Sequence, residues 1–212
     1  MINAIRHNGL TLAIFACVTT GLVAVTQYFT KDQIKRQEQA QLSSVLNQVI
    51  PKQIHDNLLF ESCILLTNPA LGTDKAMPAY IATLNGEPTA IAIESVAPDG
   101  YNGAIKIITG IDNTGTVLAT RVLSHQETPG LGDKIDLRVS DWISSFSGKQ
   151  LNESNYDRWK VRKDGGDFDQ FTGATITPRA VVKAVRNTVE FVNANRQQLL
   201  TQPLNCGENR HE

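Results

Sequence analysis

The pattern of hydrophobic and polar positions divides the chain into three parts. An apolar stretch runs from Leu10 to Phe29 without a charged residue. Residues 30–50 follow a mostly polar helical pattern, with apolar residues returning at helical spacing only near its end. Beyond residue 51, short stretches rich in β-branched residues alternate with turn signals, and a long helical pattern comes last. This order predicts an anchor, a connecting helix and a folded domain.

The first part has the length of a membrane span. A helix of about 20 residues is about 30 Å long, which matches the hydrocarbon core of a bilayer. A cleaved signal peptide is the alternative, but the apolar run is long for one and no convincing small-residue cleavage site follows it. We therefore expect a short tail over residues 1–9, one transmembrane helix over 10–29 and a helical stalk over 30–50. The stalk either lifts the domain from the lipid, packs on a neighbouring subunit or docks on its own domain.

Four short stretches predict an antiparallel meander, at residues 80–84, 90–96, 105–108 and 117–123. Turn signals join the first pair at residues 85–88 and the second pair at 112–115. A short helix is expected over 139–146, with Val139, Trp142, Ile143 and Phe146 on one side.

A final helix is expected at about 178–200, with Thr177 as its N-cap and Pro178 as its first residue. Valines recur at helical spacing along this helix. The predicted fold class is α+β, with an antiparallel sheet covered by helices on one side, in a domain over residues 51–212.

Composition excludes several kinds of function. The formal net charge is −1 and there is no long basic run, so a nucleic-acid partner is not expected. Four scattered histidines, and two cysteines outside the apolar stretch, give no metal-ligand spacing. No nucleophile and base can be paired by their pattern, which disfavours a secreted hydrolase.

Two threonine hydroxyls stand just before the final helix, in the segment Thr172-Gly173-Ala174-Thr175. A helix N-terminus has unpaired N–H donors and a partial positive charge, so it favours a phosphate. Gly173 and Ala174 would let a phosphate approach the backbone closely. From the residues alone, a capped helix with no ligand is the commoner interpretation of so short a pattern.

Asp169–Thr175 resembles the flavinylation signature of the FMN-binding subunits of bacterial redox-driven ion pumps: Asp, two variable residues, Ser or Thr, then Gly-Ala-Thr. The segments Ala97–Gly103 and Glu127–Lys134, the single span and the stalk stand in the same order as in the G subunit of the Rnf/Rsx electron transport complex. The resemblance covers nearly the whole chain. A more distant similarity links the chain to the C subunit of the sodium-pumping NADH:quinone reductase.

The resemblance implies a covalent flavin. The 5′-phosphate of FMN would be esterified to Thr175 and cradled by Thr172, Gly173 and Ala174. An unaided threonine hydroxyl is a poor nucleophile, so a separate flavin transferase is implied. Asp169 would be part of the segment that this enzyme recognises. The 127–134 loop would clamp the ring or the ribityl chain through Thr128, Gly130, Leu131 and Lys134, with Lys134 available to the phosphate or the reduced flavin. The alternative for that loop is an ordinary surface turn.

The function implied is an electron-carrying flavoprotein subunit of a membrane redox complex, with other subunits, the transferase and the lipid bilayer as partners. The domain alone is expected to catalyse little. The alternative is a membrane-anchored scaffold with no cofactor. Tyr101 is either a ring-stacking residue or part of the core.

The side of the membrane is not fixed by charge. Arg6 precedes the apolar stretch and Lys31, Lys35 and Arg36 follow it, which favours a cytoplasmic domain. The resemblance implies the opposite: a bacterial inner-membrane protein with its domain in the periplasm. Cys63 and Cys206 are either two free thiols or a disulfide that an oxidising compartment would permit.

Overall fold

The computed structural model describes residues 2–206, apart from the side chains of residues 2–5, 32 and 35. Residue 1 of the expected tail and residues 207–212 of the expected domain lie outside the described residues. The chain divides into two compact units, Met1–Leu42 and Ser43–Glu212. The first unit consists of helix α1, which spans Ile2–Val49 and so continues into the second unit.

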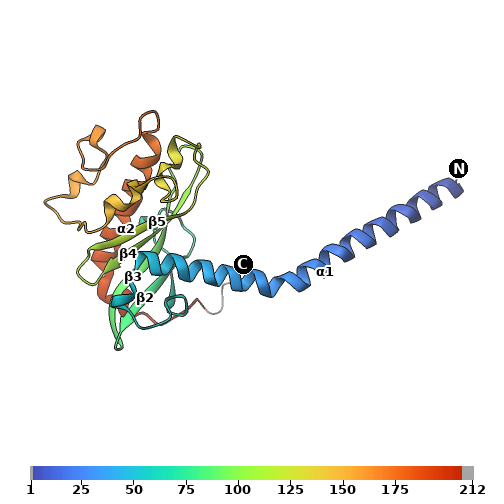
Figure 1. Ribbon diagram of the computed structural model, residues 1–212, viewed down its shortest axis with the longest axis horizontal. Coiled ribbons are helices and arrows are strands. Elements are labelled where there is room, and N and C mark those ends of the chain that lie inside the picture. Colours follow the sequence, from blue (N-terminus) through green and yellow to red (C-terminus); the bar gives the residue numbers. More distant parts are fainter. Residues whose placement is uncertain (1, 207–212) are drawn as a thin grey trace. The chain divides into compact units, whose positions relative to one another are not determined.

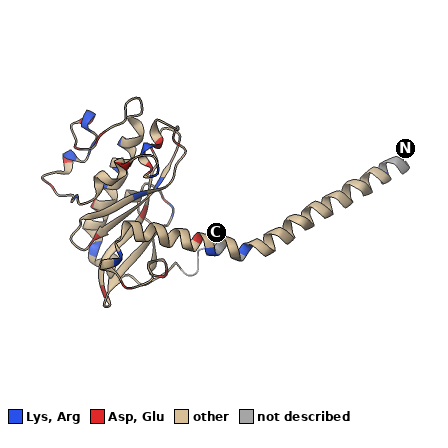
Figure 2. Cartoon of the chain, viewed as in Figure 1, with Lys and Arg blue, Asp and Glu red and all other residues tan. Residues whose placement is uncertain are grey.

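Helix α1 contains the expected span. Its stretch Arg6–Lys31 is the one helix in the described part of the chain that is long and apolar enough to cross a membrane, and none of its most apolar window is buried by protein. Figure 2 shows the uncharged run as an unbroken tan ribbon. The threonines bond back to their own helix, as in Thr19 Oγ1 to the Phe15 carbonyl at 2.9 Å. This satisfies their hydroxyls without water.

The second unit contains a five-stranded antiparallel meander, in the order β1-β2-β3-β4-β5 (Figure 1). The strands are β1 Cys63–Leu66, β2 Met77–Leu84, β3 Glu87–Ala97, β4 Ile105–Asp112 and β5 Val117–Ser124. The last four confirm the predicted meander. β1 was missed because four residues reading Cys-Ile-Leu-Leu show no alternation of apolar and polar positions.

The first predicted turn is confirmed as a two-residue hairpin loop between β2 and β3. Asn85 has φ 54° and Gly86 has φ 82°, the left-handed conformations that a type I′ turn requires. Asn and Gly are the residues that adopt this conformation at least cost. The turn pairs Leu84 with Glu87, and an irregularity between Ala82 and Thr83 then shifts the register so that Ala82 faces Ala90.

One face of the sheet packs against helix α2, Ile176–Thr201. Alternate strand residues point to this face, where isoleucines of β1 to β4 meet the valines of α2. The predicted valine stripe is confirmed, since five valines of α2 are at most 1% exposed: Val181, Val182, Val185, Val189 and Val192. This packing fixes α2 across the sheet.

The opposite face is covered as well, so the expectation of helices on one side only was wrong. The last turn of α1 packs there: Leu46, Val49 and Ile50 are fully buried, and the Val49 carbonyl lies against Gly110. Small residues line up across the central strands at this point, with Ala92 paired to Gly110 and Gly110 to Ala119. A Cβ at Gly110 would be 2.2 Å from that carbonyl oxygen. Small side chains on this face therefore make room for the helix end. Figure 1 shows this part of the α1 ribbon lying over the sheet.

Short 3-10 helices make up the other helical segments of the domain. Three precede or flank β1, and four lie between β5 and α2: Lys52–Ile54, Leu59–Glu61, Pro69–Leu71, Gly132–Ile135, Asp141–Phe146, Tyr156–Arg158 and Arg162–Asp164. The helix predicted at 139–146 is a 3-10 helix that begins at Asp141. The Ser140 hydroxyl accepts a hydrogen bond from the Trp142 N–H, which starts the helix later and leaves Val139 52% exposed.

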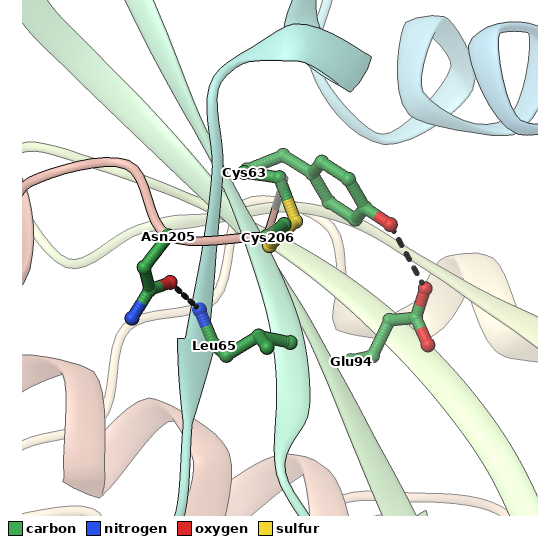
Figure 3. The surroundings of a disulfide bond; sticks show 6 residues. Cys63, Leu65, Glu94, Asn205 and Cys206 are labelled. Atoms are coloured by element: carbon green, nitrogen blue, oxygen red, sulfur yellow. Dashed lines mark hydrogen bonds between the residues drawn. A yellow bond between two sulfur atoms is a disulfide. The ribbon is translucent and has the colours of Figure 1, made fainter. Parts of the chain in front are cut away.

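A disulfide joins Cys63 on β1 to Cys206 near the C-terminus (Figure 3). The neighbouring Asn205 pairs with the same edge strand: its side-chain oxygen accepts from the Leu65 N–H at 2.6 Å, and its own N–H donates to the Cys63 carbonyl at 3.2 Å. The C-terminal segment therefore covers the free edge of β1, where unpaired strand groups would otherwise face solvent.

Replacing both cysteines, Cys63→Ser with Cys206→Ser, should lower the free energy of unfolding by about 2–5 kcal/mol, because the bridge closes a loop of 143 residues. Urea unfolding of the full chain in detergent, followed by tryptophan fluorescence, measures this. Reduced wild-type protein should match the double variant. Cys17→Ser, in the apolar part of α1, is the matched control and should change nothing. Equal urea midpoints for the wild type and the double variant would contradict this account of the bridge.

Candidate functional site

The N-terminus of α2 begins two residues earlier than expected. Thr175, not Thr177, holds the N-cap position, and Pro178 is the third helical residue rather than the first. Thr175 has helical angles, φ −74° and ψ −27°. A competing bond explains the difference, because the Thr177 hydroxyl donates to Glu127 Oε2 at 2.5 Å instead of accepting from a backbone N–H of the helix.

No side chain of the described residues caps the first turn of α2. The backbone N–H groups of Ile176 and Thr177 have no intrahelical acceptor and are therefore available to a ligand, whereas Pro178 has no N–H. Gly173 precedes them with φ +80°, and Leu131 Cδ2 at 3.7 Å is the only atom found within 4 Å of the place its Cβ would take. The segment that resembles the flavinylation signature thus ends at an open helix N-terminus.

Glu127 lies beneath this helix end and is 5% exposed. Besides the bond from Thr177, its Oε1 accepts from the backbone N–H of Asn102 at 3.1 Å. The carboxylate thereby joins three segments: the connection between β3 and β4, the loop after β5 and the first turn of α2. Gly132 packs directly on this contact, since a Cβ there would be 2.7 Å from Glu127 Oε2 and 2.8 Å from the Thr177 hydroxyl.

The predicted clamp loop is a compact turn built on one carbonyl. The Thr128 carbonyl accepts from the N–H groups of Leu131 and Gly132, both at 3.1 Å. The Thr128 hydroxyl accepts from the Asn102 side chain at 3.2 Å. These bonds hold Leu131, which is 42% exposed, above Gly173.

A 3-10 turn with three consecutive charged residues forms another side of the site. Arg162 pairs with Asp169 at 2.9 Å, and Asp164 pairs with Arg179 of α2 at 2.6 Å. The Arg179 guanidinium holds the pKa of the Asp164 carboxyl below its usual range. The two outer residues are thus tied to either side of the signature segment, and Lys163 between them lines the cavity described next.

The start of the signature segment is anchored in the core. Phe171 is 8% exposed and its ring lies 5.2 Å from that of Trp142. The Trp142 indole N–H donates to the Asp169 carbonyl at 2.8 Å. Thr172 and Gly173 remain exposed beyond this anchor. The segment is therefore fixed at its first half and accessible at its second.

These elements enclose an open cavity of about 570 Å³. Its walls come from the β3–β4 connection, the clamp loop, the 3-10 turn and the start of α2: Tyr101, Glu127, Thr128, Leu131, Gly132, Lys163, Gly173, Ala174, Thr175, Ile176 and Thr177. Cavities of this size hold ligands as large as a nucleotide cofactor.

The structure brings five of the predicted site residues to this cavity: Thr128, Leu131, Gly173, Ala174 and Thr175. Asp169, Thr172, Gly130 and Lys134 lie outside its lining. Tyr101 is 65% exposed and lines the cavity, so the interpretation of it as a core residue was wrong.

Sequence reasoning missed five lining residues as individual site residues: Glu127, Gly132, Lys163, Ile176 and Thr177. No sequence signal pointed to Lys163, which reaches the cavity only because its neighbours are tied by ion pairs. Glu127 was expected only as the first residue of the clamp loop.

The lining fits FMN in its chemistry. A half-buried hydroxyl, small residues and free helix N–H groups lie together at Gly173–Thr175, as a phosphate group requires. The apolar side chains of Tyr101, Leu131 and Ile176 provide a surface for a flat ring. Lys163 adds a positive charge.

Comparison with known proteins gives matches to two family models and to relatives that cover nearly the whole chain. Residues 1–49 match the family model described as the RnfG N-terminal region, and residues 100–190 match that of the FMN-binding domain. The second range contains every residue that lines the cavity.

Curated relatives agree with these models. The chain is 83% identical over 207 residues to the G subunit of the ion-translocating oxidoreductase complex of Vibrio vulnificus (strain YJ016), covering 98% of each chain. It is 64% identical over 206 residues to the protein of that name from Vibrio cholerae serotype O1 (strain M66-2), covering 97% of this chain and 99% of the relative. The protein of that name from Shewanella baltica (strain OS223) is 59% identical over 210 residues, covering 99% of both. The chain therefore belongs to the RnfG family, the G subunits of ion-translocating oxidoreductase complexes.

Proposed function

We propose that this protein is the electron-carrying flavoprotein subunit of a membrane-bound, redox-driven ion-translocating complex, and that its FMN is attached to Thr175 through a phosphoester. The observation that carries the proposal is the position of Thr175, at the uncapped N-terminus of α2 and in the wall of the cavity. The FMN-binding domain match over this region and the names of the relatives support it.

The proposed roles of the residues follow from the lining. The Thr175 hydroxyl would give its proton to a base of the transferase as Oγ bonds to phosphorus, and the P–O bond to the leaving group of an activated flavin phosphate would break. The product equals protein plus free FMN less one water. The N–H groups of the first turn of α2 bind the remaining phosphate oxygens, and Gly173 and Ala174 keep side chains out of their way. Lys163 is better placed than Lys134 to face the phosphate or the ring, because only Lys163 lines the cavity. Bound FMN supplies a ring that accepts electrons singly or in pairs.

A separate flavin transferase is part of the proposal. In the described residues, no base accepts a hydrogen bond from Thr175 Oγ1, so its hydroxyl is not activated by this chain. The transferase must supply an activated flavin phosphate and a base. Asp169, Gln170 and Thr172 are exposed beside the cavity and are the side chains through which it would read the signature.

We propose that the domain lies on the periplasmic side of the bacterial inner membrane, with α1 as a single-pass anchor. Two observations support this placement: the span Arg6–Lys31 and the Cys63–Cys206 disulfide, since such bonds persist in oxidising compartments. The basic residues after the span argue otherwise, but large domains are translocated despite such charges.

Thr175→Ala should abolish covalent flavin, because alanine has no oxygen to esterify. Protein co-expressed with a flavin transferase and denatured on a gel should fluoresce for the wild type and not for the variant. Intact mass should show FMN less one water on the wild type. Thr175→Ser keeps the hydroxyl and should retain some flavin, whereas Thr172→Ala tests the neighbouring hydroxyl. If wild-type protein isolated from its own membranes has Thr175 unmodified in every molecule, the proposal is wrong. An anchored scaffold would then be the remaining interpretation.

Orientation can be tested with a membrane-impermeant maleimide in a Cys17→Ser background. A cysteine placed by Ser145→Cys, in an exposed part of the domain, should be labelled in intact spheroplasts. A cysteine placed by His7→Cys, ahead of the uncharged run that begins at Leu10, should react only after the membrane is permeabilised. The reverse labelling pattern would put the domain in the cytoplasm.

A further inference from the structure

The described part of the chain buries three carboxylates, and one of them differs from the other two. Glu94, Glu127 and Asp136 are each at most 6% exposed. Glu94 pairs with Lys106 at 2.7 Å, and Asp136 pairs with Arg138. Glu127 has no cationic partner among the described residues, although it is as buried as the others. Buried charges without a partner are costly, so a fold keeps one only where something offsets its cost.

Neutral donors, not a cation, surround the Glu127 carboxylate. Each oxygen accepts one hydrogen bond, from the Thr177 hydroxyl and from the Asn102 N–H. The adjacent N-terminus of α2 adds a partial positive charge. Each carboxylate oxygen therefore has a donor, and the carboxylate lies in the wall of the cavity.

The packing around Glu127 is built for this carboxylate. Gly132 packs directly on it, because a Cβ there would be 2.7 Å from Oε2 and would displace the carboxylate. Gly100 also lies close, with the place of its Cβ 2.9 Å from Oε1, although the Gly103 carbonyl oxygen at 2.1 Å is the nearer obstacle there. The Glu127 backbone N–H donates to His125 Nδ1 at 3.1 Å, and this bond fixes the backbone of Glu127.

We propose that Glu127 is a positioning residue of the flavin site that also lowers the flavin's reduction potential. This inference rests on the proposed function. Through Thr177 the carboxylate holds the first turn of α2 so that Thr175 faces the cavity. Its negative charge opposes the electron density added to a ring bound in the same cavity, because like charges repel most strongly where water is excluded. The oxidised form is thereby favoured over the reduced form.

The substitution Glu127→Gln removes the negative charge of the side chain but keeps its packing contacts. Glutamine has the same shape and keeps an acceptor oxygen, so the packing persists while the charge is lost. We expect the ratio of reduced to oxidised flavin at a fixed potential to rise at least tenfold, a midpoint shift of about +30 mV for a two-electron couple. A spectroelectrochemical titration of the flavin-loaded full chain at constant pH measures it.

Two controls distinguish electrostatics from structure. Thr177→Val removes the same hydrogen bond without removing the charge; it should lower the melting temperature and the flavin content but not raise the potential. Glu190→Gln removes a carboxylate on an exposed position of α2, 15 residues beyond Thr175 in sequence and outside the cavity lining, and should leave the potential unchanged. If Glu127→Gln and Thr177→Val behave alike, Glu127 is only structural and the proposal is overturned.

Glu127→Asp covers the case in which the glutamine variant does not fold. It retains the charge with a shorter reach, so flavin content should fall while the potential of the loaded fraction stays near that of the wild type. A rise of about 30 mV or more in that fraction would overturn the proposal. Wild-type protein that carries no flavin would contradict the proposed function itself, whereas flavin present with an unshifted potential in Glu127→Gln would contradict only this inference.

Discussion

The packing of α2 across the sheet is the constraint on which the rest of the domain depends. Its valines are buried against one face, so the direction of the helix and the place where it begins are fixed by the core. The hydrogen bond from Thr177 to Glu127 then ties the helix start to the loop after β5. Because the first turn of a helix carries free N–H groups, fixing the helix also fixes a place for an anion.

The two faces of the sheet pack against different helices. This is possible because successive side chains along a strand point to opposite faces. Bulky isoleucines point to the face that packs on α2, whereas Ala92, Gly110 and Ala119 point to the face that receives the end of α1. Leu46, Val49 and Ile50 are fully buried there, so the last turn of α1 is part of the domain core.

Local patterns predicted the elements that have strong periodicity, and tertiary contacts decided the rest. The span, the hairpin at Asn85–Gly86 and the valine stripe follow from short-range chemistry, so they could be read directly. The helix start at Thr175 could not, because a residue 50 positions away draws the Thr177 hydroxyl out of a capping role. Lys163 could not either, since its place depends on a 3-10 turn whose flanking residues contact Asp169 and Arg179, which lie further along the chain. Local rules thus failed where the site is assembled.

Charge is distributed around the cavity in a way that suits a redox carrier. The charged groups at its rim neutralise one another, as in the Arg162–Asp169, Asp164–Arg179 and Asp99–Lys183 pairs. Exposed pairs of this kind stabilise little but leave few net charges to act at long range. Within the lining, Lys163 and Glu127 carry opposite charges. The reduction potential of a flavin in this cavity would therefore depend mainly on two charges of the chain. Lys163 would favour added electrons and Glu127 would oppose them.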